Sequence, residues 1–76
     1  MQQITFHLDA QYGDYVELNQ LLKLTGLCDS GGAGKMLVAN GNVKVDGKLE
    51  ERKTAKIRAG QVVRLGDVRI QVLAAI

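Results

Sequence analysis

A chain of 76 residues has room for one domain, here residues 1–76, and is too short to enclose a large cavity. No apolar run approaches the roughly 18 residues of a membrane span, and the first ten residues lack the pattern of a secretion signal. The net charge of +2 conceals an uneven distribution of charge between the two halves of the chain. One lysine and four acidic residues give −3 over residues 1–34, while nine basic and four acidic residues give +5 over residues 35–76. The basic second half favours an anionic partner.

The first elements are predicted to be a strand and a helix. Three apolar residues alternate with polar ones, as in a half-buried strand: Ile4, Phe6 and Leu8. After a turn at residues 12–14, Asp14 is expected to cap a helix, with Glu17 completing a capping box. The helix should end at Gly26. Its buried face is predicted from three leucines at helical spacing: Leu18, Leu21 and Leu22.

A second helix is predicted to begin at Asp29 or Ser30 and to end near Asn40. Its core face is expected at positions i, i+3, i+4 and i+7: Ala33, Met36, Leu37 and Asn40. The opposite side would then carry Gly31, Gly34, Lys35 and Val38. The three early glycines have two interpretations, which the sequence leaves open. They allow either close approach of a ligand to the backbone or close packing of helices.

Two hairpins are expected in the second half. For the turn at Asp46–Gly47 we prefer a three-residue loop over residues 45–47, because that register keeps the apolar face intact. It would place Val43 opposite Leu49, and Lys44 opposite Lys48 with two like charges facing each other. The later hairpin turns at residues 66–67. Its two-residue loop is expected to form three cross-strand pairs: Leu65–Val68, Arg64–Arg69 and Val63–Ile70.

The connection over residues 50–58 is polar and strongly basic, which indicates either a solvated loop or an anion-binding segment. Gly34–Lys35 does not form a phosphate-binding P-loop, because Asp29 stands where the first glycine is needed and Met36 where Ser or Thr is needed. Cys28 is the one cysteine, so it forms no internal disulfide and fits a reducing, cytoplasmic compartment. With His7 as the one histidine, we expect no metal site, no cofactor and no catalytic residue.

Several short motifs follow one another in the order of a known family. They are Glu17 to Leu22, Gly26–Leu27, Ser30 to Lys35, Gly41 to Lys48, Arg52–Lys53 and Lys56 to Gly60. Over roughly residues 14–73 this order resembles the RNA-binding domain named after small-subunit ribosomal protein S-four, also called the αL RNA-binding motif. The free-standing, single-domain branch of that family fits best. The resemblance implies an α+β fold in which two N-terminal helices pack on a small, bent, mostly antiparallel sheet.

The resemblance also implies where RNA would bind. The expected surface combines the start of the second helix, the hairpin and the basic loop. Its residues are Ser30, Gly31, Gly32, Lys35, Asn42, Lys44, Lys48, Arg52, Lys53 and Lys56. This chain departs from the family at Glu17 to Asn19, where many members have Arg-Leu-Asp, and at Gly31, where many have arginine. Two expected phosphate contacts are then missing, which implies either a lower affinity or a contact made instead by the backbone N–H groups of Gly31 and Gly32.

We therefore expect a non-catalytic, cytoplasmic, bacterial protein that binds structured RNA, with ribosomal RNA as one candidate. It should be a monomer, with no membrane contact and no small-molecule substrate. The alternative is a small protein-interaction module or adaptor without nucleic acid, for which Val38 and the apolar residues 73–76 would offer contacts. A sulfur carrier of the ubiquitin type is disfavoured, because such carriers end in Gly-Gly and this sequence ends in Ala75–Ile76. An enzyme is the weakest class, since no nucleophile, base and orienting group come together.

Overall fold

The computed structural model describes residues 2–75 and places the strands in two sheets. The larger sheet has the order β1-β7-β6-β3-β4, and the smaller pairs β2 with β5. The larger sheet comprises β1 (Gln2–His7), β7 (Val68–Leu73), β6 (Val62–Leu65), β3 (Val43–Val45) and β4 (Lys48–Leu49). The smaller sheet comprises β2 (Tyr15–Glu17) and β5 (Lys56–Arg58). The remaining elements are η1 (Ala10–Tyr12), α1 (Leu18–Leu24) and α2 (Gly31–Ala39).

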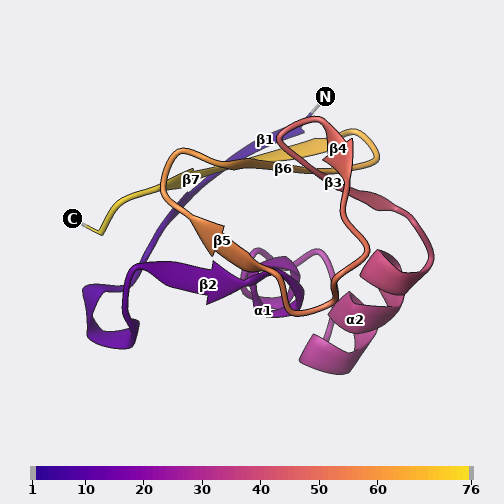
Figure 1. Cartoon of the computed structure of the whole chain (residues 1–76), viewed down its shortest axis with the longest axis horizontal. Helices are drawn as coiled ribbons and strands as arrows, with labels where there is room; N and C mark the ends of the chain where they lie inside the picture. Colours follow the sequence, from indigo (N-terminus) through magenta and orange to yellow (C-terminus); the bar gives the residue numbers. More distant parts are fainter. Residues whose placement is uncertain (1, 76) are drawn as a thin grey trace.

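Both helices and the β2–β5 pair lie on one side of the five-stranded sheet (Figure 1). β1 pairs with β7 in parallel, and the other strand pairs are antiparallel. The core between the layers is apolar. From the helices it receives Leu18, Leu21, Leu22 and Val38, and from the strands Val43, Ile57, Val63, Ile70 and Val72. The predicted α+β class, with helices on one face of a mostly antiparallel sheet, is confirmed.

The first helix begins later than expected. Residues 15–17 form β2 and pair with residues 56–58, so the capping box at Asp14 does not form. Glu17 occupies the N-cap position but makes no side-chain capping hydrogen bond. The tertiary pairing prevails because Ile57, 1% exposed, buries its side chain there. The predicted loop over residues 50–58 is likewise wrong at its end, where residues 56–58 are a strand.

The second helix begins as predicted and presents a different face. Ser30 is the N-cap, and its Oγ accepts a hydrogen bond from the Ala33 N–H (3.1 Å). Gly34 and Val38 are the buried residues, whereas Met36 is 60% exposed. The predicted core face is therefore wrong for Met36 and Asn40, which are exposed, while Leu37 packs against the core as predicted. Buried Val38 cannot serve as a surface contact. The reason is α1: the backbone of Asn19 lies directly against Gly34, where a side chain would not fit.

The first hairpin has a shorter loop than expected. Lys44 pairs with Leu49 and Val45 with Lys48, so the predicted opposition of Lys44 and Lys48 is wrong. Asp46 (φ 52°) and Gly47 (φ 83°) both have positive φ, the geometry of a type I′ turn that matches the twist of the strands. The mixed faces are tolerated because β4 is a two-residue edge strand whose side chains are both exposed. The second hairpin has the predicted register.

Candidate nucleic-acid interface

The basic loop is fixed to the start of α1 by backbone hydrogen bonds. The Leu18 N–H donates to the Ala55 carbonyl (2.8 Å), and the Asn19 N–H donates to the Lys53 carbonyl (3.2 Å). The antiparallel pairing of β2 with β5 brings these groups together, because it ends where the loop meets the helix. The loop carbonyls satisfy helix N–H groups that would otherwise require a side-chain cap. The backbone of the loop is thus anchored to α1, while residues 51–54 are exposed to solvent.

Asn19 also connects this loop to the start of α2. Its side chain is 3% exposed, and its Nδ2 donates to the Gly31 carbonyl at 3.4 Å. A Cβ built on Gly31 would lie 2.8 Å from the Gln20 Nε2, and one on Gly34 would lie 2.5 Å from the Asn19 carbonyl oxygen. Gly34 therefore serves close helix packing against backbone, whereas at Gly31 the nearest atom is the end of the flexible Gln20 side chain. Gly32 is different, since a Cβ there would meet nothing nearer than the Ser30 Oγ at 3.8 Å.

Three cations line a hollow beside the loop. Its volume is about 610 Å³, and its lining consists of basic and neutral polar residues: Arg52, Thr54, Lys56, Arg58 and Gln61. The Tyr15 ring lies under two of the cations, with the Lys56 Nζ 5.1 Å and the Arg58 Cζ 5.8 Å from its centroid. These distances are typical of cation–π interactions, which hold both cations against the ring across the β2–β5 pair.

Gln61 fixes the far side of this hollow. Its Oε1 accepts from the Arg58 N–H (2.7 Å), and its Nε2 donates to the Asp46 Oδ2 (3.2 Å). The Asp46 Oδ1 accepts in turn from the Val62 N–H (3.0 Å). The turn of the first hairpin is thereby held against the start of β6. These hydrogen bonds hold the wall of the hollow in place, which favours a preorganised binding surface.

Arg52 already has an anionic partner. Its Nε and Nη2 donate to the two carboxylate oxygens of Glu50 at 3.1 and 3.0 Å, and its backbone N–H donates to the Glu50 Oε2. These hydrogen bonds lower the pKa of the Glu50 carboxyl below its ordinary value and raise the pKa of Arg52. Among residues 2–75 this is the one ion pair. Arg52 therefore contributes less free positive charge to the hollow than Lys56 or Arg58.

The predicted surface residues do not form one group. Ser30, Gly31 and Gly32 at the start of α2 adjoin the loop of Lys53 through Asn19. Arg52 and Lys56 line the hollow. Three other predicted residues lie apart from that hollow: Lys35 is exposed on α2, Lys48 lies on edge strand β4, and Lys44 is exposed on the outer face of the sheet. Asn42 lines a second hollow with Lys44.

Sequence reasoning missed three residues of this region. Arg58 belongs to the same basic run. Its alternation with apolar Ile57 was the available signal that it shares a strand face with Lys56. Gln61 and Asn19 gave no local signal, because their importance comes from partners distant in the chain.

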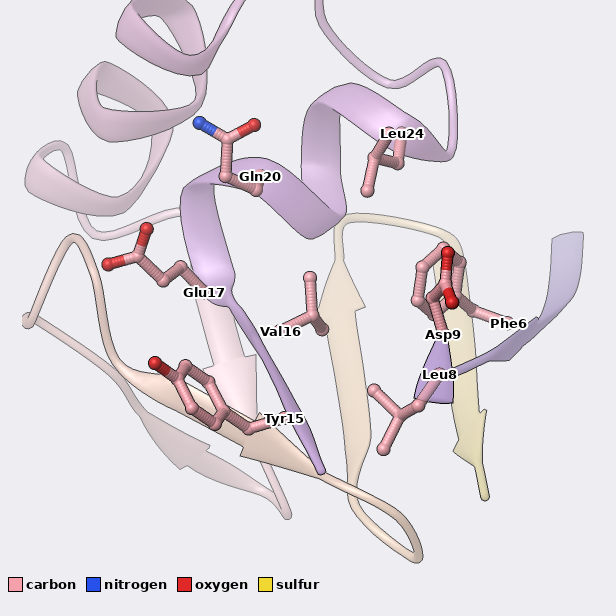
Figure 2. Close-up of a pocket in the computed structure, with 8 residues that line it drawn as sticks. All are labelled: Phe6, Leu8, Asp9, Tyr15, Val16, Glu17, Gln20 and Leu24. Atoms are coloured by element: carbon pink, nitrogen blue, oxygen red, sulfur yellow. The ribbon is translucent and has the colours of Figure 1, made fainter. Parts of the chain in front are cut away.

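A third hollow is mainly apolar and has a volume of about 350 Å³ (Figure 2). It lies between the end of β1, β2 and α1, and Leu24 at its rim is 60% exposed. Asp9 and Glu17 give it an acidic edge. The Asp9 Oδ1 accepts from the Gln11 N–H (2.9 Å), so that carboxylate already serves as a cap.

No group of three potential metal-ligating side chains occurs among residues 2–75. Neither described helix is long and apolar enough to cross a membrane.

Comparison with known proteins gives a consistent result. The model of the family described as "S4 domain" matches residues 10–73. Two proteins are 50% identical to this chain over 60 residues, covering 79% of it and 86% of each relative: the "Putative RNA-binding protein YbcJ" of Escherichia coli strain K12 and the "Uncharacterized protein YbcJ" of Shigella flexneri. The solution structure of E. coli YbcJ, described as revealing an αL motif involved in RNA binding, superposes with a TM-score of 0.72 at 44% identity. That superposition covers 97% of this chain and 91% of YbcJ, and the resemblance stated from the motifs is confirmed.

Proposed function

The chain belongs to the S4-domain family, and from that premise we propose that it is a non-catalytic protein of the cytoplasm that binds structured RNA. Ribosomal RNA is one candidate. The proposed surface extends from the start of α2, across the loop of Lys53, to the hollow lined by Arg52, Lys56 and Arg58. We define it as the loop surface. Lys35 on α2 and Lys48 on β4 lie apart from the hollow and are proposed as additional RNA contacts, and the protein is proposed to bind RNA as a monomer.

The observation that carries this proposal is the hollow of about 610 Å³, whose five lining residues include three cations and no carboxylate. Basic side chains of this kind bind the phosphate backbone, and that contact dominates the affinity for nucleic acid. The neighbouring helix start adds two N–H groups, at Gly31 and Gly32, that helix geometry leaves without an intrahelical acceptor. Because double-stranded RNA hides its base edges, a surface of this kind would recognise the shape and the backbone of the RNA.

The test is salt-dependent binding of a 16-base-pair RNA duplex, with a duplex DNA of the same sequence for comparison. Lys53→Gln and Lys56→Gln should each weaken RNA binding and lower the slope of log affinity against log salt by roughly 0.7 to 0.9 per lost phosphate contact. Gln11→Glu is the matched control, because it also changes the net charge by one and lies on η1, away from the loop surface. Lysine variants that behave like this control would refute the loop surface.

One observation favours the alternative of a protein-interaction module. The apolar hollow of Figure 2 is lined by exposed Leu24 and by the acidic residues Asp9 and Glu17. Such a lining would suit a partner segment that carries an apolar side chain flanked by basic residues. Purification at low salt separates the two functions. An RNA-binding protein should carry 260 nm absorbance that nuclease removes, whereas an interaction module should carry none and should retain its partner through nuclease treatment.

A further inference from the structure

The register of the sheet aligns three cations on its outer face. Lys44 of β3 is directly opposite Arg64 of β6, and Arg64 is directly opposite Arg69 of β7. The row continues to Gln3 of β1. At about 4.8 Å between neighbouring strands, the three cations span roughly 10 Å at their Cα atoms. We call Lys44, Arg64 and Arg69 the sheet row.

This face points away from the helices. Lys44 lies between buried Val43 and Val45, and the neighbours of Arg64 and Arg69 along their strands are buried or half-buried apolar residues. Both helices and the β2–β5 pair cover the other face (Figure 1). The loop surface lies on the same side of the sheet as the helices, because β5 and α1 position it. The sheet row and the loop surface therefore belong to opposite sides of the five-stranded sheet.

No sheet-row cation forms an ion pair within the described residues. The one ion pair among residues 2–75 joins Glu50 to Arg52, and none of the five strands of the larger sheet contains an acidic residue. Like charges directly opposite each other destabilise a sheet. Two consecutive like-charge pairs in the middle of an otherwise well-paired sheet therefore carry a stability penalty that an anion would relieve.

The surroundings of the row are shaped for a polyanion. A hollow of about 260 Å³ opens at one end of the row, lined by Lys44, Arg64, Asn42 and two glycines, Gly41 and Gly66. Thr5 and Gln71 are cross-strand neighbours next to the other end. Guanidinium groups bind phosphate through paired hydrogen bonds. Amide and hydroxyl side chains can pair with 2′-hydroxyl groups, which mark RNA.

We propose that the sheet row is a second RNA-binding surface that contacts the phosphate backbone of a different RNA segment from the one on the loop surface. This inference rests on the proposed function. The molecule measures 32 × 25 × 20 Å along its principal axes, so it separates two segments held on opposite sides. The protein then bridges two parts of a folded RNA.

The first experiment measures the salt slope for the binding of a second 16-base-pair RNA duplex to protein whose loop surface already holds one duplex. Arg64→Gln should lower the slope by roughly 0.7 to 0.9, so that its affinity falls about threefold less than that of the unmodified protein between 50 and 200 mM salt. Arg64→Lys should retain the slope, because the charge remains. Gln11→Glu again controls for net charge. An Arg64→Gln slope equal to that of the control would overturn the second surface.

The second experiment tests bridging. Protein bound to an immobilised duplex should capture a second, fluorescent duplex, and Arg64→Gln should reduce that capture severalfold while the first duplex stays bound. Failure of the unmodified protein to capture the second duplex would also overturn the inference. Arg69 is half-buried, so exposed Arg64 is the safer residue to change. Thermal unfolding shows that the variant is folded.

The outcomes separate the two proposals. If the protein binds duplex RNA, and Lys53→Gln weakens it while Arg64→Gln matches the control, only the second surface fails. If the unmodified protein binds no RNA, both proposals fail. Amide shifts in the unmodified protein give an independent readout, because RNA should then perturb Lys44, Arg64 and Arg69 in addition to residues 52–58.

Discussion

Gly34→Ala is the sharpest test of how the two helices are packed. A Cβ at Gly34 would lie 2.5 Å from the Asn19 carbonyl oxygen, 3.1 Å from its Cα and 3.2 Å from its carbonyl carbon. These are backbone atoms, so no rotation of a side chain relieves the contact. α1 and α2 must separate by roughly 0.9 Å to bring this Cβ–oxygen distance to 3.4 Å, where ordinary van der Waals contact begins.

The magnitude follows from two opposing effects. Overpacking of a well-packed core destabilises by about 1–3 kcal/mol. Alanine in place of glycine in a helix contributes about 0.5–1 kcal/mol of stability. We expect Gly34→Ala to lower the free energy of unfolding by about 1–2 kcal/mol, or roughly 4–16 °C in the thermal midpoint of a domain this small.

Gly32→Ala is the matched control on the same helix. Its Cβ would meet only the Ser30 Oγ at 3.8 Å, an ordinary contact, so the variant should be as stable as the unmodified protein or more stable by about 0.5 kcal/mol. Urea unfolding followed by far-ultraviolet circular dichroism measures both variants. Equal stability of Gly34→Ala and Gly32→Ala would refute the packing argument.

Two side chains carry the remaining predictions. Glu50→Gln should free Arg52 for phosphate and raise both RNA affinity and salt slope, and an unchanged slope would place Arg52 outside the interface. Because Arg52 lowers the pKa of Glu50, the pair stabilises the fold above pH 4.5, and this contribution is lost as the pH falls through the lowered pKa. Between pH 6 and pH 3 the urea midpoint should therefore fall further in the unmodified protein than in Glu50→Gln, and equal falls would contradict the pair's role. Asp46→Ala should destabilise by about 1–2 kcal/mol, because it removes acceptors for Val62 and Gln61 at a positive φ, whereas Asp46→Asn should lose less; equal losses in denaturant would argue against this role of the φ angle.

Local chemistry predicted the elements whose partners are close in the chain. Ser30 caps α2 because its Oγ reaches a backbone N–H three residues on, a contact that needs no tertiary structure. The second hairpin has its predicted register because Leu65 and Val68 flank a two-residue turn and both face the core. The parity of apolar residues there allows one arrangement.

The first hairpin shows where that reasoning stops. An intact apolar face argued for a three-residue loop, but β4 is a short edge strand with both side chains exposed. Burial therefore exerted little influence on register, and the positive φ angles of Asp46 and Gly47 decided it. Similarly, residues 15–17 form β2 in place of the expected first helical turn because they pair with β5. A local pattern could not predict this pairing, since β5 lies some forty residues later in the chain.

Some features of the candidate site are likewise visible in the sequence, and others depend on the tertiary structure. The basic run and its division from the acidic first half are properties of the sequence alone, and they indicated an anionic partner. Two questions needed the tertiary structure: which cations share a surface, and whether the glycines face a ligand or a helix. The contact of Gly34 with the Asn19 backbone shows that this glycine faces a helix.

The sequence by itself determined the family, the α+β class and the basic character of residues 44–58, because motif order, apolar periodicity and charge are all local. The tertiary structure alone decided that Lys44 faces Arg64 on the outer side of the sheet, while Lys56 and Arg58 border a hollow on the helix side. The physical reason is strand pairing. Register sets which side chains become neighbours, and it depends on partners that a local pattern does not contain.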